Sequence, residues 1–348
     1  MQIFNFLQLL RIVTIASALA GLTGSAAAQE RVTVGATRAA SNGALFLAAG
    51  KGYFKEEGLD VELKFYTAQQ AVSALATGEA DLAAAEFTPA AFSFAGKGAL
   101  KAIAAQAREF NGFEGNEIVA SNAAYAKGLR KLEDLSGKTV GITQLGSVYH
   151  YQIAQIARLK RFDFKNVLLK TYPSFDALAA AVSKDQLDAA ILPATLARDI
   201  LTASQAKLVG WYSDVDQQQV GALFASAKMI AGRRASVEKF VRAYQRGAAD
   251  FAAALLRKDR YAKRVSDANS RSAALIVAKY IYPSESPDRA ASLIEGTAYY
   301  TDPQGRFDVG DIYDQVTWFK SQGLIEAGTD ARDILDLSFV KGHTNSPK

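Results

Sequence analysis

Apolar and polar positions follow two different periods along this chain, and the two periods alternate. Short runs with an apolar residue at every second position, or with several in succession, predict strands over residues 31–37, 61–66, 80–85, 101–108, 117–121, 139–143, 167–171, 189–192, 208–212 and 221–226. Runs at helical spacing predict helices over residues 42–51, 69–77, 148–159 and 175–183. Strands that alternate with helices are typical of parallel sheets with right-handed crossovers. We therefore predict an α/β fold of mostly parallel sheets flanked by helices.

Three segments of the chain recur later in the same order. The pairs are residues 33–41 with 139–147, residues 63–66 with 169–172, and, one position further along, residues 78–84 with 185–191. Such a repeat indicates one structural unit used twice, as two lobes. Each copy opens with a strand that ends in Gly, Thr and Ser before an apolar helix, so each presents backbone N–H groups at a helix start. Two such ends facing each other would form a cleft suited to a small polar ligand.

The remaining pattern indicates how the two copies are joined. Two crossings between the copies, near residues 119 and 222, predict a two-strand hinge. We expect the first lobe to comprise residues 29–118 and 222–348, and the second lobe residues 119–221.

The end of the chain has helical spacing. Helices are expected over residues 236–257, 270–282 and 312–322. Ser236 is predicted to cap the first of these helices and Asp311 the last. We expect this block to pack on the first lobe, with Trp318 and Phe319 in its core.

Residues 1–28 differ from the rest of the chain. They hold a single charged residue, Arg11, an apolar run over residues 12–22, and a final Ala-Ala-Ala that ends at Ala28. This pattern predicts a secretory signal peptide that is cleaved after Ala28. We therefore expect the protein to act in the periplasm, after passing through the inner membrane.

Composition excludes several kinds of site. The chain has no cysteine, which removes disulfides, a thiol nucleophile and a lipid-carrying cysteine. The net charge of +5 is scattered rather than gathered on one face, so we expect no nucleic-acid partner. No metal-ligand spacing, catalytic triad or phosphate-binding glycine loop is present, and we expect neither a cofactor nor an enzymatic activity.

Four segments in order, residues 48–59, 74–81, 132–141 and 187–193, resemble the solute-binding proteins of ABC importers of the nitrate, sulfonate, taurine and thiamine-precursor type. The resemblance covers nearly the whole chain after residue 28. It implies a two-lobed periplasmic binding fold of type II, which closes on a small-molecule ligand and delivers it to an ABC permease in the inner membrane. We expect the protein to be a monomer.

Candidate ligand contacts in the first lobe follow its strands. Ser41 and Asn42 lie at the first helix start and Gln69 at the next, and Glu86, Phe87 and Thr88 follow the buried strand where the family places ligand contacts. Arg38 and Arg108 are the candidates for pairing with an anionic group of the ligand. The alternative for Arg38 is a solvated surface charge, and the alternative for Arg108 is a structural salt bridge between the lobes. Glu86 would repel a purely anionic ligand, so it is either neutralised by Arg38 or Arg108 or receives a hydroxyl or an amine.

Candidate contacts in the second lobe gather at the equivalent helix start and strand ends. They are Gln144, Ser147, Tyr149, His150, Pro193, Thr195 and Trp211. His150 is one of two histidines, and hydrogen bonding or stacking suits it better than metal binding. The second wall of the cleft therefore includes several rings.

Several rings with one or two arginines suggest an aromatic carboxylate as the ligand. A sulfonate such as taurine, or a pyrimidine precursor of thiamine, is the alternative within the same class of protein. An alternative of another class is a pyrimidine-synthesising enzyme on the same fold. A third alternative is that the ligand-bound protein binds a sensor rather than a permease.

Overall fold

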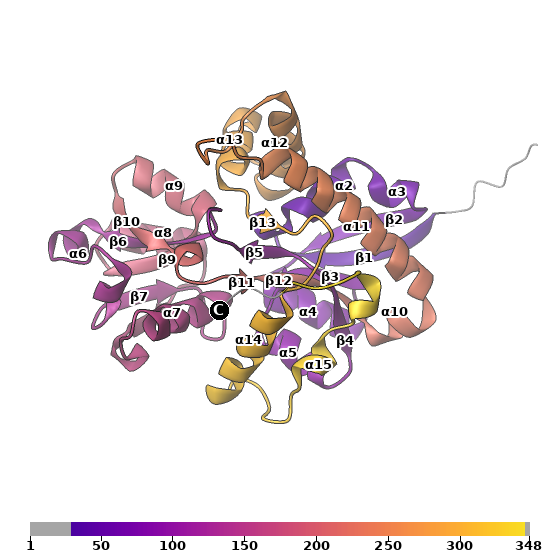
Figure 1. The fold of residues 1–348 in the computed structure, drawn as a ribbon, viewed down its shortest axis with the longest axis horizontal. Helices are drawn as coiled ribbons and strands as arrows, with labels where there is room; N and C mark the ends of the chain where they lie inside the picture. The colour runs from indigo at the N-terminus through magenta and orange to yellow at the C-terminus, as the bar shows by residue number, and fades with distance from the viewer. Residues whose placement is uncertain (1–28, 345–348) are drawn as a thin grey trace, which may run out of the picture.

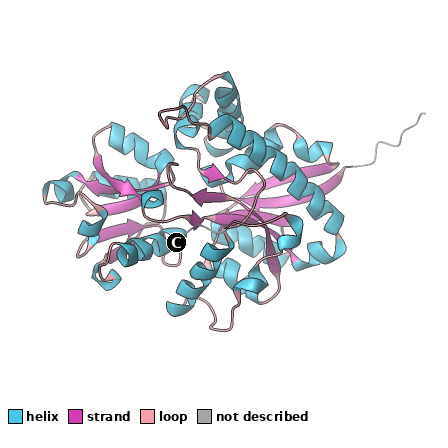
Figure 2. Cartoon of the chain, viewed as in Figure 1, coloured by secondary structure: helices cyan, strands magenta, loops and turns pink. Residues whose placement is uncertain are grey.

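The computed structural model describes residues 29–344 and consists of two α/β lobes (Figures 1 and 2). The signal peptide predicted for residues 1–28 lies outside the described residues. The first sheet has the strand order β2-β1-β3-β12-β4. Its strands are β1 (Glu30–Ala36), β2 (Leu59–Phe65), β3 (Leu82–Glu86), β4 (Leu100–Ala105) and β12 (Gly221–Ser226). We call this sheet and the helices packed on it the first lobe.

The second sheet, with its helices, forms the second lobe. Its strand order is β10-β6-β9-β7-β8. The strands are β6 (Asn116–Ser121), β7 (Thr139–Ile142), β8 (Leu168–Thr171), β9 (Ala189–Pro193) and β10 (Ala206–Trp211). The lobe boundary predicted near residue 119 stays a prediction, and all of β6 pairs within the second sheet.

The two sheets have the same topology, as the sequence repeat predicts. In each, the first strand is parallel to its two neighbours, and a strand from elsewhere in the chain adds antiparallel to the third. Asp81 accepts a hydrogen bond from Thr33 N at 2.9 Å, and Asp188 accepts one from Thr139 N at 2.8 Å. These equivalent contacts explain why the aspartate recurs in both copies. The predicted α/β fold is confirmed.

Helices cover both faces of each sheet. In the first lobe they are α2 (Gly43–Gly50), α3 (Tyr53–Glu56), α4 (Ala68–Thr77), α5 (Pro89–Gly96), α10 (Ala227–Gly232), α11 (Arg234–Leu255), α12 (Ala268–Ile281), α13 (Pro287–Thr297), α14 (Val309–Ser321) and α15 (Ala331–Ile334), with 3-10 turns at Ala40–Asn42 and Leu337–Phe339. In the second lobe they are α6 (Asn122–Ala126), α7 (Val148–Leu159), α8 (Phe175–Ser183) and α9 (Ala194–Thr202), with 3-10 turns at Leu132–Leu135, Phe164–Asn166 and Tyr212–Asp214. Two apolar cores fill each lobe, one on each face of its sheet.

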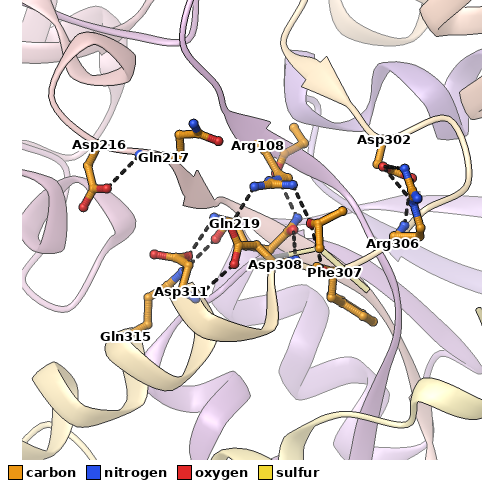
Figure 3. Close-up of polar contacts among 12 residues, drawn as sticks. Arg108, Asp216, Gln217, Gln219, Asp302, Arg306, Phe307, Asp308, Asp311 and Gln315 are labelled. Carbon is orange, nitrogen blue, oxygen red and sulfur yellow. Dashed lines mark hydrogen bonds and ion pairs between the residues drawn. The ribbon is translucent and has the colours of Figure 1, made fainter. Parts of the chain in front are cut away.

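A small third sheet joins the lobes. It consists of β5 (Ala107–Glu109), β11 (Gln218–Gln219) and β13 (Tyr300–Thr301), so a third strand supports the two crossing segments. Arg108 and Asp308 form a fully buried ion pair of 2.6 Å beside it (Figure 3). Asp311 accepts a hydrogen bond from Gln219 N at 2.7 Å, which ties β11 to α14. We call these three strands the connecting sheet.

Two predicted helix caps are wrong. Ser236 lies inside the first turn of α11, and its hydroxyl donates to Glu30. Asp311 lies inside α14, where Asp308 is the N-cap. Both polar side chains are buried and serve contacts with other elements, which sequence spacing alone does not reveal.

Two further expectations change. The strand expected over residues 101–108 divides at Gln106 into β4 and β5, which belong to different sheets. Phe319 is in the core, as predicted, whereas Trp318 is only partly buried and its ring contacts His150 and Tyr151 of the second lobe. Within residues 29–344, no helix has the length and apolar character needed to cross a membrane.

Candidate functional site

A cleft of about 340 Å³ lies between the rims of the two lobes. Thr37, after β1, and Thr143, after β7, both line it, so the equivalent ends of the two copies share one opening. The other lining residues are Arg38, Ala39, Tyr66, Thr67, Ala68, Gln69, Glu86 and Thr88 from the first lobe, and Gln144, Ser147, Val148, Tyr149, Pro173, Ser174 and Phe175 from the second. The cleft therefore lies beyond the carboxyl ends of the parallel strands, where α/β sheets commonly bind ligands.

Four helices begin at this cleft, and their capping side chains line it. Thr67, Thr88, Ser147 and Ser174 each accept a hydrogen bond from a backbone N–H in the first turn of α4, α5, α7 and α8, at 3.1–3.3 Å. Hydroxyl caps of this kind satisfy N–H groups that the helix leaves free. The remaining N–H groups and the helix dipoles favour acceptor oxygens of a ligand.

Glu86 is the carboxylate of the cleft. It ends β3, and Ser41 Oγ donates to its Oε1 at 3.0 Å. Burial raises the pKa of the Glu86 carboxyl, and the hydrogen bonds that it accepts oppose this rise. This hydrogen bond comes from the protein itself, so the expectation that Glu86 receives a hydroxyl or an amine of the ligand stays a prediction.

Aromatic rings form the facing wall. Tyr149 and Phe175 of the second lobe pack edge to face, with ring centroids 5.2 Å apart. Burial, with the nearby charges of Glu86 and Glu109, holds the pKa of the Tyr149 hydroxyl well above its usual range. Tyr66 lies on the first lobe, and its hydroxyl donates to Glu79 at 2.6 Å. The cleft thus combines flat apolar surface with a small set of polar groups.

The two candidate arginines have other partners. The Arg38 guanidinium lies 3.6 Å from the centre of the Phe65 ring and donates to the Tyr280 carbonyl at 2.7 Å, at the exposed rim. Arg108 is buried in the connecting sheet with Asp308 and Thr344. Neither arginine is paired with Glu86.

Of the residues predicted from the sequence, seven line the cleft: Arg38, Gln69, Glu86, Thr88, Gln144, Ser147 and Tyr149. Ser41 and Asn42 lie directly behind it. Asn42 donates to Thr37 and to the Ala84 carbonyl, so it fixes the rim rather than lining the cleft.

The other predicted residues lie away from the cleft wall. Phe87 is in the core, stacked on Phe92 with ring centroids 5.2 Å apart. His150 is buried, accepts from Gly146 N at 3.0 Å and meets the Trp318 ring. Thr195 lines a neighbouring groove. The remaining three, Arg108, Pro193 and Trp211, lie in or beside the strands that join or border the lobes.

The profile of the NMT1/THI5-like proteins matches residues 40–254, more than half of the chain. The chain belongs to the NMT1/THI5-like family. No protein among the curated ones matches its sequence.

Solved structures place this NMT1/THI5-like chain in the periplasmic binding protein fold. The aliphatic sulphonate-binding protein SsuA of Escherichia coli superposes with a TM-score of 0.68 at 14% identity, covering 92% of this chain and 96% of its own. The ligand-binding component of an ABC-type import system of Staphylococcus aureus gives 0.67 at 16%, covering 91% and 100%. The nitrate-binding protein NrtA of Synechocystis gives 0.65 at 12%, covering 87% and 84%.

The sequence reasoning missed part of the second wall of this NMT1/THI5-like cleft. Pro173, Ser174 and Phe175 follow β8, and residues 67–69 follow β2 at the equivalent place. The repeat pairs residues 63–66 with 169–172, so continuing it by three positions would have found them. Among the described residues, no group of three or more His, Cys, Asp or Glu could hold a metal ion.

Proposed function

We propose that the protein is the solute-binding component of an ABC importer and captures a small organic molecule between its lobes. One observation carries this proposal: Thr37 and Thr143, equivalent residues of the two copies, line a single cleft between lobes that a narrow sheet connects. A ligand that touches both rims favours the closed arrangement, because it gains contacts that neither lobe offers alone.

The comparisons support this function. The E. coli relative in fold is a periplasmic sulphonate-binding protein, the S. aureus relative belongs to an ABC-type import system and the Synechocystis relative binds nitrate. By analogy, the ligand is handed to a permease and the protein works in the periplasm. We further propose that it acts as a monomer and that residues 1–28 are removed on export. We propose that one lobe consists of β1 to β4 and β12 with their helices and the other of β6 to β10 with their helices, with the connecting sheet between them.

The rings in the cleft support a ligand that contains a ring. Tyr66, Tyr149 and Phe175 offer more aromatic surface than a small inorganic ion requires. The carboxylate group of such a ligand has weaker support, because the two arginines expected to bind it have partners in the protein. Arg108 is paired with Asp308, and Arg38 donates to the Tyr280 carbonyl. A simple sulfonate lacks arginine partners for the same reason, whereas a pyrimidine remains compatible with the rings.

We propose no enzymatic activity. A pyrimidine-synthesising enzyme on this fold would use an active-site histidine. Here His150 Nδ1 accepts from Gly146 N, and the ring packs on Trp318. These contacts support a structural role for His150 at the start of α7.

The test is to purify the protein from its native periplasm, denature it and identify the released small molecules by mass spectrometry. We expect about one organic molecule per chain. Thr143→Trp should fill the cleft and abolish this yield, whereas Thr317→Trp, on the exposed face of α14, should leave it unchanged. A folded protein that releases no small molecule, or an equal yield from Thr143→Trp, would contradict the proposal.

A further inference from the structure

Glu86 faces the cleft without a positively charged partner. Among the described residues, the Ser41 hydroxyl is the side chain that hydrogen-bonds to it, and no arginine or lysine forms an ion pair with it. A carboxylate that loses water on lobe closure must be neutralised or hydrogen-bonded, because an uncompensated buried charge is costly. Two sources can supply it: a proton, which the raised pKa of Glu86 favours, and a positively charged group of the ligand.

The two nearby arginines do not supply it. Arg108 is held at 2.6 Å by Asp308 inside the connecting sheet. Arg38 points from the rim towards Phe65 and the Tyr280 carbonyl. A ligand that carries only negative charge would therefore meet Glu86 directly, and like charges at short range repel.

The second-lobe wall of the cleft carries two aromatic rings. Tyr149 comes from the second lobe and lines the same cleft as Glu86 of the first lobe. Phe175 packs on Tyr149 and extends this surface. A carboxylate and aromatic rings that line one cleft can bind an ammonium group, through charge and cation–π attraction together.

A neighbouring groove carries further carboxylates. It shares Ser174 and Phe175 with the cleft, and its charged lining consists of Asp176, Asp199, Glu285 and Arg289. Arg289 is paired with both Asp199 and Glu285, at 2.7 and 3.3 Å. The groove therefore carries more carboxylate than guanidinium groups, which favours cations over anions beside the cleft.

We infer that the ligand carries a basic nitrogen, an amine or a protonated ring nitrogen, which Glu86 of the first lobe holds against Tyr149 and Phe175 of the second. This inference rests on the proposed function and specifies its substrate class. Glu86 is the residue that selects for this nitrogen. Other parts of the same molecule can place acceptor oxygens at the starts of α7 and α8.

The test uses three probes that share one ring: benzylamine, benzoate and 4-(aminomethyl)benzoate. Their affinities for the purified exported protein, freed of bound molecules by unfolding and refolding, are measured by calorimetry. We expect each amine-bearing probe to bind at least tenfold more tightly than benzoate. Glu86→Gln should abolish this preference, a loss of about 1.4 kcal/mol or more. Glu86→Asp should keep part of it, and Glu326→Gln, at the exposed surface, should keep all of it.

The outcomes separate this inference from the proposed function. Tighter binding of benzoate, or an amine preference that survives in folded Glu86→Gln, overturns the inference and leaves the function intact. If no probe binds, the molecule released from native protein decides: one with a basic nitrogen supports the inference, and one without it overturns it. If neither a probe nor a native molecule binds, both proposals fall.

Discussion

Single residues of the sequence motifs have two kinds of role in this structure. Asp81 and Asp188 belong to a recurring segment, and both accept a hydrogen bond from a backbone N–H of a parallel strand. Arg108 follows a strand as a ligand-binding residue would, yet it is paired with Asp308, some two hundred positions later in the chain. Spacing identifies such residues but not their partners, because the partners come from distant elements.

Glu109 should make stability depend on pH. Its Oε1 accepts from Asn116 N at 2.9 Å, and burial raises its pKa to about 8. The folded state therefore keeps a proton that the unfolded chain has lost above about pH 4.5, so raising the pH favours unfolding up to about pH 8. Each pH unit in this window should lower the free energy of unfolding by about 1.4 kcal/mol through Glu109.

Glu109→Gln should remove this contribution, because a glutamine keeps the acceptor oxygen but does not titrate. The measurement is the free energy of unfolding in urea at pH 5, 6, 7 and 8. Glu117 and Asp311, whose pKa values burial raises to about 8 and about 7, act in the same direction, so the slope should decrease rather than vanish. An unchanged slope would show that Glu109 is ionised in the folded protein.

Elements were predicted best where local signals agree. Helices α7 and α8 and strand β12 have the bounds expected from the sequence, since Ser147 and Ser174 cap the helices and β12 is continuously apolar. Helices α9 and α13 were not predicted, and they pack on each other across the lobes. Long-range packing of this kind leaves no local pattern, so the flanks of the cleft could not be placed.

Helices α2 and α11 approach each other closely at Gly247. A Cβ atom there would lie 2.5 Å from Ala48 Cβ and 2.6 Å from the Ala44 carbonyl oxygen. Gly247→Ala should therefore lower the free energy of unfolding by about 1–3 kcal/mol, despite the better helix propensity of alanine. Gly232→Ala is the matched control, because a Cβ there meets open space. Chemical denaturation of both variants measures the difference, and equal stabilities would contradict the tight helix contact.

The two-lobed architecture of the molecule was predicted from the internal sequence repeat more than from any single motif. The repeat predicts two sheets of like topology and a shared cleft, and both are present. The direction of each side chain at the cleft was predicted less well: only seven of the fifteen candidate residues line the cleft, and the other eight lie elsewhere. Neighbouring positions at a strand end, such as Glu86 and Phe87, point to opposite sides, and one-residue shifts decide which side faces the ligand.

The central claim is that the lobes close on a ligand in this cleft. The chain has no cysteine, so Lys64→Cys and Lys170→Cys place one label on each lobe, at equivalent positions of β2 and β8. The distance between the labels is measured in protein purified with its native small molecule and again after unfolding, dialysis and refolding. We predict a shorter and narrower distance distribution in the loaded form. The same distribution in both forms would contradict the account.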